Sequence, residues 1–191
     1  MIRLQLKTYA LAVFLCGICW SEFSLGKPKV DAELREKLKQ VIDQADSFED
    51  KFDAQVWLVQ KSNVLKRFVK DDNERFQILK EVHHAAKRAG VPPEFVLAVI
   101  QIESHFDRFA LSSAGAQGMM QVMPFWKKEI GREDDNLMDL KTNLKYGCTI
   151  LKHYLDREKG DWKYALARYN GSYGKYWYPE KVLVAWQKYW R

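Results

Sequence analysis

Apolar residues recur at intervals of three and four along most of this 191-residue chain, which is the spacing of amphipathic helices. Polar breaks, glycines and prolines separate the periodic segments and predict where each helix starts and stops. No stretch alternates apolar and polar residues for long, so the pattern does not predict a sheet. We therefore predict an all-α fold with at most a small hairpin, and helices near residues 31–45, 56–68, 76–90, 92–104, 124–131, 139–160, 162–170 and 179–189.

The first residues have the pattern of a secretory signal. Arg3 and Lys7 precede a short apolar run, residues 10–19, which is shorter than a comfortable membrane span. Small residues then favour cleavage at the end of residues 1–26, with cleavage after Ser21 as an alternative. The pattern predicts an exported protein, and retention of this segment as an uncleaved membrane anchor stays open.

The composition is that of a globular protein. Hydrophobic residues make up 47% of the chain and aromatic residues 14%, which excludes a disordered chain. The net charge of +6 is interspersed with acidic residues rather than gathered in a stripe, so it favours a negatively charged polymer over nucleic acid. Cys148 is the one thiol beyond the leader, and we expect it to be buried as helix packing rather than to form a disulfide.

Glu103 stands near the end of an apolar run, residues 92–104, and carries the clearest chemical signal. A carboxyl group in apolar surroundings loses hydration, which raises its pKa and keeps it protonated closer to neutral pH. Such an acid can protonate a poor leaving group, for example a glycosidic oxygen. The segment 112–124 is short of charge and rich in small residues and amides, as polysaccharide grooves often are. An enzyme that cuts sugar chains is one interpretation, and a buried structural carboxylate is the other.

Ordinary glycosidases use two carboxylates, and the sequence offers Glu103 one partner at helical spacing, Asp107. We expect Asp107 to lie in solvent at the end of the helix, which leaves a single carboxyl group in an apolar setting. The histidines His83, His84 and His105 do not form a metal-binding pattern, so we predict no metal and no cofactor.

Four segments, in this order, resemble the motifs of the soluble lytic transglycosylase family, glycoside hydrolase family 23: residues 103–104, 115–124, 143–147 and 167–171. The resemblance implies a lysozyme-like, goose-type fold. It covers roughly residues 76–191, so we predict a catalytic domain there and a helical extension at 27–75. Two residues depart from the usual motifs. Met119 replaces a leucine of similar volume, and Arg168 points either to solvent or to a substrate carboxylate.

The resemblance implies a role for several residues. Glu103 falls on the catalytic glutamate, and Tyr169 falls on a tyrosine that lies beside it. Glu180 is a weaker match to a glutamate that faces the groove late in the domain. The nearby aromatic run 176–178 is either a sugar platform or packing for the last helix. The remaining substrate-binding positions fall on Ser112, Gln121, Met123 and Asn170.

The resemblance also implies a reaction on peptidoglycan glycan strands. Glu103 would protonate the oxygen between N-acetylmuramic acid and N-acetylglucosamine, the N-acetyl group would stabilise the cation, and Glu103 would then deprotonate the C6 hydroxyl. The product is a 1,6-anhydro end, so no water is consumed. The alternatives are a goose-type lysozyme that hydrolyses the same bond and a silent peptidoglycan-binding protein. We expect a periplasmic monomer that does not bind nucleic acid; recruitment by the membrane or by a wall-spanning machine stays open.

Overall fold

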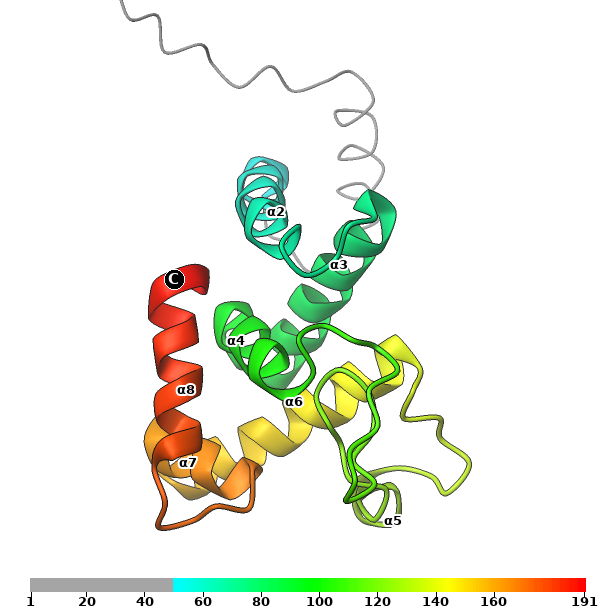
Figure 1. Ribbon diagram of the computed structural model, residues 1–191, viewed down its shortest axis with the longest axis vertical. Helices are drawn as coiled ribbons and strands as arrows, with labels where there is room; N and C mark the ends of the chain where they lie inside the picture. Colours follow the sequence, from blue (N-terminus) through cyan, green and yellow to red (C-terminus); the bar gives the residue numbers. More distant parts are fainter. Residues whose placement is uncertain (1–49) are drawn as a thin grey trace, which may run out of the picture. The chain divides into compact units, whose positions relative to one another are not determined.

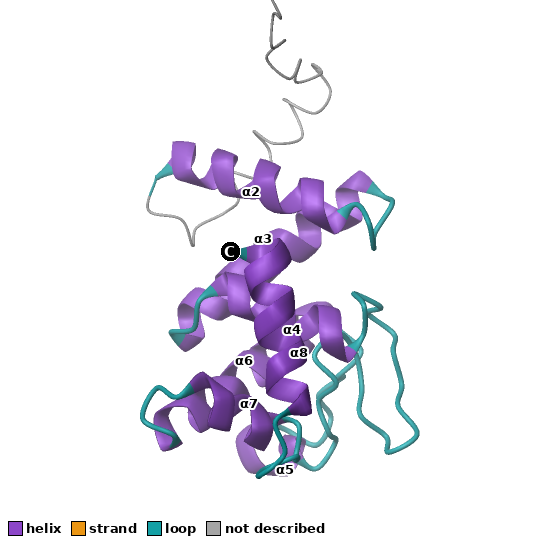
Figure 2. Cartoon of the chain, turned by 60° about the vertical axis from the view of Figure 1, so that its left-hand side comes forward, coloured by secondary structure: helices purple, strands orange, loops and turns teal. Residues whose placement is uncertain are grey.

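The computed structural model describes residues 50–191, and every regular element in that part of the chain is a helix (Figures 1 and 2). Two isolated antiparallel bridges, Leu111 to Gln117 and Gln117 to Val122, are consistent with the prediction of at most a small hairpin. The predicted signal and the predicted helix at 31–45 lie outside the described residues. The helices are α2 (Lys51–Leu65), α3 (Asp72–Ala89), α4 (Pro93–Glu103), α5 (Trp126–Ile130), α6 (Leu140–Arg157), α7 (Trp162–Tyr169), α8 (Trp177–Ala185) and the π-helix η1 (Trp186–Trp190).

Local chemistry explains where these helices begin and end. Gly90 ends α3 with φ at +74°, a left-handed conformation that costs glycine little. Pro93 opens α4, where its missing N–H group would have had no partner inside the helix. Four other helices begin at an aspartate whose side chain accepts hydrogen bonds from backbone N–H groups of the first turn: Asp50, Asp71, Asp139 and Asp161.

Helix α4 is the central helix of the described region. It contacts α3, α8 and η1, and residues 95–100 are all buried (Figure 1). A helix covered by neighbours on several sides can be apolar all round, which explains the unbroken apolar run in its sequence. Its last residue, Glu103, leads directly into the first of the two long loops, residues 104–125 and 131–139, which lie together on one side of the helices in Figure 2.

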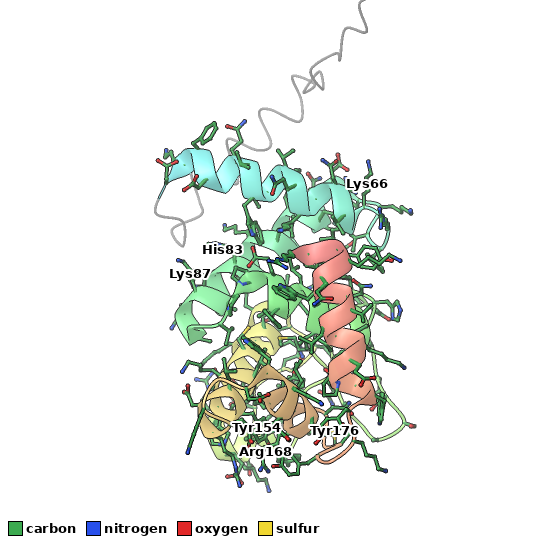
Figure 3. The ribbon with its side chains drawn as sticks, turned by 90° about the vertical axis from the view of Figure 1, so that its left-hand side faces the viewer. Lys66, His83, Lys87, Tyr154, Arg168 and Tyr176 are labelled. Atoms are coloured by element: carbon green, nitrogen blue, oxygen red, sulfur yellow. The ribbon has the colours of Figure 1, made fainter. Side chains whose placement is uncertain are left out.

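Helix α2 packs on the same body through polar groups as well as apolar ones. Lys61 Nζ donates a hydrogen bond to the Trp190 carbonyl oxygen at 2.6 Å, and Trp57 Nε1 donates to Glu94 Oε1 at 2.6 Å. The Trp57 ring also meets His83 of α3 edge-on, with centroids 5.1 Å apart; Figure 3 labels His83 beside α2. Residues 50–75 therefore pack against the part of the chain that carries the motifs.

Within residues 50–191, no helix combines the length and the apolar character that crossing a membrane requires.

Candidate active site

The carboxyl group of Glu103 emerges at the C-terminal end of α4, where the apolar helix meets the loop 104–125. Burial raises the pKa of Glu103 to about 7, and a hydrogen bond from Tyr178 acts in the opposite direction. Tyr178 Oη lies 2.5 Å from Glu103 Oε1. The negative end of the helix dipole lies at this end of α4 and also disfavours a carboxylate. Glu103 is therefore a carboxylic acid that stays protonated close to neutral pH.

Loop 104–125 is held against α4 and α6 by hydrogen bonds to its backbone. Ser104 Oγ donates to the Met119 carbonyl oxygen at 2.8 Å. Asn143, on α6 and almost fully buried, accepts from the Met120 N–H and donates to the carbonyl oxygens of Gln117 and Leu137, each at 2.8 Å. One side chain thus satisfies three buried backbone groups, which fixes the loop relative to Glu103.

Gly118 lies where the loop passes closest to Asn143. Its φ is +71°, and a Cβ atom there would come within 2.4 Å of Asn143 Nδ2 and 2.7 Å of the Leu137 carbonyl oxygen. Only glycine fits both the backbone conformation and the space. Gly118 therefore serves close packing of the loop, whereas Gly115 of the same segment has open space around it.

Six of the seven predicted site residues line one cavity of about 270 Å³. They come from α4, from loop 104–125 and from the end of α7. Among the residues that line the cavity, Glu103 is the only carboxyl group. The predicted residues in the lining are Glu103, Ser112, Gln121, Met123, Tyr169 and Asn170, and the others are Ala114, Ala116, Val122, Trp126 and Ile150.

Two of these residues also have structural partners. Gln121 Nε2 donates to the carbonyl oxygens of Ala110 and Gly118, at 3.1 and 3.0 Å, so part of its amide holds the loop. Tyr169 Oη donates to the Met120 carbonyl oxygen at 2.7 Å. Burial, and then the nearby charge of Glu103, raise the pKa of Tyr169 well above its usual value, so it remains a neutral phenol beside the acid.

The structure places the last helix differently from the sequence-based expectation. Glu180 is exposed on α8 and is not among the residues that line the cavity. Tyr178, two residues earlier, is buried and donates to Glu103. The only sequence signal for Tyr178 was its membership of the aromatic run 176–178. The resemblance had placed a single tyrosine beside the glutamate, whereas the structure places two there, Tyr169 and Tyr178.

Other residues weighed from the sequence lie away from the acid. Asp107 is exposed and accepts a hydrogen bond from the Phe109 N–H, after α4 has ended. Arg168 pairs with Glu158 and lies over the ring of Tyr173 at 3.9 Å. Cys148 is fully buried, and burial raises the pKa of its thiol to about 12. In the described part of the chain, no three His, Cys, Asp or Glu side chains gather as a metal site would require.

The Transglycosylase SLT domain family matches residues 80–181, more than half of this chain, and the chain belongs to that family. Membership confirms the resemblance read from the four motifs and the all-α, lysozyme-like fold class that it implied. The match does not extend to α2 or to η1, which lie on either side of it.

Sequence relatives match the same region over part of their length. The chain is 35% identical over 99 residues to the membrane-bound lytic murein transglycosylase F of Desulfosudis oleivorans, covering 49% of this chain and 21% of that protein. It is 34% identical over 106 residues to a transglycosylase of Enterobacteria phage PRD1, covering 52% of this chain and 39% of that protein. The chain therefore spans well under half the length of these relatives.

Solved structures show a remote likeness. The 70 kDa soluble lytic transglycosylase SLT70 of Escherichia coli aligns with a TM-score of 0.46 and 18% identity, covering 84% of this chain and 33% of that one. An inactive mutant of the lytic transglycosylase Slt of Pseudomonas aeruginosa aligns with a TM-score of 0.47 and 18% identity, covering 73% and 30%.

Proposed function

We propose that this protein is a peptidoglycan lytic transglycosylase, which cleaves the β-1,4 bond between N-acetylmuramic acid and N-acetylglucosamine without water. The observation that carries the proposal is a carboxyl group, with its pKa raised to about 7, in a cavity where residues 50–191 supply no second carboxylate. Both standard glycosidase mechanisms need a pair of carboxylates. A site with one needs a nucleophile from the substrate, and membership of the SLT family supports that choice.

In this mechanism Glu103 acts first as an acid and then as a base. Tyr178 occupies Oε1, so the proton of the neutral acid resides on Oε2 and is transferred to the glycosidic oxygen. The N-acetyl group of the substrate stabilises the resulting cation. Glu103 is then a carboxylate, and the hydrogen bond from Tyr178 strengthens as that charge develops. The carboxylate finally removes the proton of the C6 hydroxyl, and the C6 oxygen closes the 1,6-anhydro ring.

The cavity lining supports roles for the other predicted residues. Ser112, Met123 and Asn170 line the same cavity as Glu103, which supports contacts with the sugar at the scissile bond, and Gln121 both holds the loop and lines the cavity. We further propose that the protein is exported by its N-terminal signal to the periplasm and works there as a monomer on glycan strands. Retention by an uncleaved signal is the alternative location.

The test is mass spectrometry of purified peptidoglycan sacculi digested with the protein, beside Glu103→Gln and the matched control Asp107→Asn. We expect anhydromuramic ends from the wild type and from Asp107→Asn, and none from Glu103→Gln, because Asp107 is an exposed carboxylate outside the cavity. Reducing ends would instead identify a lysozyme. Intact binding with no release by the wild type would identify a silent wall-binding protein.

A further inference from the structure

The segment between α7 and α8 is anchored to the cavity at both ends. Tyr169 and Asn170 line the cavity just before it, and Tyr178 donates to Glu103 just after it. Residues 171–177 therefore extend from the wall of the cavity and return to it. Whatever this segment binds lies next to the bond that Glu103 acts on.

Large aromatic rings on and beside this segment are exposed to solvent. Tyr173 and Trp177 expose 53% and 50% of their surface, whereas their neighbour Tyr178 exposes 2%. Rings that only packed the last helix would be buried as Tyr178 is, so packing does not account for Tyr173 and Trp177. Tyr164 of α7 joins them, with its ring centroid 6.0 Å from those of Tyr173 and Tyr176. Half-exposed rings at such spacing form a stacking surface.

Cationic side chains accompany these rings. Lys163 Nζ lies 3.8 Å from the centroid of Tyr176, and Lys181 Nζ lies 5.2 Å from that of Trp177. Arg168 lies over Tyr173 but is paired with Glu158, and Figure 3 shows Arg168 and Tyr176 at the same end of the described region. Within residues 50–191, neither Lys163 nor Lys181 forms an ion pair with a carboxylate. Their charge is therefore available to a ligand.

The combination of rings and lysines selects one class of ligand. Exposed aromatic faces alone suit any sugar, and lysines alone suit any anion. Both occur here a few ångströms apart, on and beside a segment that is flanked by Asn170 of the cavity and by Tyr178, the partner of Glu103. The combination suits a polymer in which sugar rings alternate with carboxylate-bearing groups. Peptidoglycan is such a polymer, because peptide stems with free carboxylates hang from every second sugar.

We propose that Tyr173, Trp177, Lys163 and Lys181 form a platform that binds the peptide-bearing glycan strand beside the cavity, with the rings on the sugars and the lysines on stem carboxylates. The inference rests on the proposed function, since it takes the cavity to hold a glycan strand. Its consequence is a preference for strands whose stems carry free carboxylates over the same strands with those carboxylates converted to neutral amides.

Binding in a Glu103→Gln background tests the platform without turnover. We would measure the fraction of protein that co-sediments with untreated sacculi and with sacculi whose free carboxylates have been converted to neutral amides by a carbodiimide and a small amine. Lys163→Gln/Lys181→Gln should lower affinity for untreated sacculi by roughly tenfold and leave affinity for the amidated sacculi unchanged, because these present no carboxylate to the lysines. Added salt should abolish the difference. Tyr173→Ala/Trp177→Ala should lower affinity for both polymers by roughly tenfold. Circular dichroism checks that each variant is folded.

The matched control is Lys188→Gln, because Lys188 also lies over an aromatic ring, that of Tyr189 at 5.2 Å, but on η1. The proposal would be overturned if Lys163→Gln/Lys181→Gln bound as well as Lys188→Gln. It would also be overturned if the double lysine variant lost equal affinity for both polymers. These arms do not depend on product chemistry. A wild type that releases no anhydro ends refutes the proposed function, whereas unchanged binding by the platform variants refutes the platform alone.

Discussion

Helix α4 carries a glutamate at each end, and the two have opposite uses. Glu94, in the first turn, accepts a hydrogen bond from Trp57 of α2 at 2.6 Å, and Glu103, the last residue, has Tyr178 of α8 at 2.5 Å from its carboxylate. The first lies at the positive end of the helix dipole, which suits a carboxylate; the second lies at the negative end, beside a cavity and largely buried. The same residue type is therefore an attachment point at one end of α4, and at the other end it is a carboxyl group with a raised pKa beside a cavity.

The surroundings of the two glutamates differ in the same way. Around Glu94, α2 and η1 form a brace. Its Lys61 is buried and donates a hydrogen bond to the Trp190 carbonyl oxygen. Burial lowers the pKa of Lys61, and the nearby charge of Glu94 raises it. Around Glu103 a cavity is left open. The comparison teaches that the position of a carboxyl group on the helix, and what covers it, decide whether it is structural or reactive.

The largest expected difference is in activity. Glu103→Gln should lower the rate of anhydro-end release by at least ~10²–10⁴-fold, because one group supplies both acid and base catalysis. Glu94→Gln keeps an oxygen for Trp57 and should change the rate by less than about threefold. Initial rates on sacculi, measured at a temperature where both variants are folded, make the comparison. Equal losses would mean that Glu103 contributes only to the structure.

The second difference is in stability. Between about pH 4.5 and 7, native Glu103 holds a proton that the unfolded chain has released, so its contribution to stability falls as pH rises. Glutamine does not titrate. Glu103→Gln should therefore raise the free energy of unfolding by up to about 3 kcal/mol above pH 7 and by nothing below pH 4.5. Urea unfolding at pH 4.5, 6 and 8 would measure the difference, and a constant difference across pH would contradict it.

His83, on α3 against the Trp57 ring of the brace, should have the opposite effect on stability. Burial lowers the pKa of His83 to about 4. Between about pH 6.5 and 4, His83 is therefore protonated in the unfolded chain and neutral in the native protein. Its contribution to stability is lost as pH falls through that window. In the wild type, the opposite pH dependences that Glu103 and His83 give to the free energy of unfolding partly cancel between about pH 4.5 and 6.5. In Glu103→Gln only that of His83 remains, so the free energy of unfolding should fall more steeply as pH decreases.

Tyr178→Phe should have a smaller effect on activity than loss of Glu103. The hydroxyl lowers the pKa of Glu103, so its removal should move the fall in kcat/KM with rising pH from about 7 to higher pH. The rate at pH 6 should fall roughly tenfold, because the carboxylate formed during the reaction loses a charge-assisted hydrogen bond. The control is Tyr189→Phe on η1. A lower rate with an unchanged pH profile would contradict a role for Tyr178 in setting the pKa of Glu103.

The smallest expected effect belongs to the brace. Lys61→Met should lower the free energy of unfolding by about 1 kcal/mol, because the buried Trp190 carbonyl oxygen loses its donor while a costly buried charge is also removed. Lys66→Met, on an exposed lysine at the end of α2, should change nothing measurable. The rate of anhydro-end release by folded Lys61→Met should stay within about twofold. A larger loss would show that the brace also positions Glu103.

Much of the fold was readable from local patterns. The periodicity predicted the ends of most described helices to within about four residues, but α2 starts at Lys51, well before the predicted residue 56, because Asp50 caps it. The apolar run around Glu103 agrees with a buried helix that delivers a carboxyl group with raised pKa. The last helix starts at Trp177 rather than at Pro179, because a proline in the first turn needs no N–H partner and so does not mark the first residue. It also continues as a π-helix, which no pattern indicated.

The sequence by itself determined the apolar helix, the uncharged loop and the family, and it pointed to Glu103 as the candidate acid, because desolvation, periodicity and motif spacing are properties of neighbouring residues. Only the tertiary structure decided which groups meet. Tyr178, 75 residues from Glu103, became its hydrogen-bond partner, and Lys61 met Trp190 across 129 residues. Such pairs depend on how α8, η1 and α2 pack around α4, and packing between distant helices leaves no local trace in the chain.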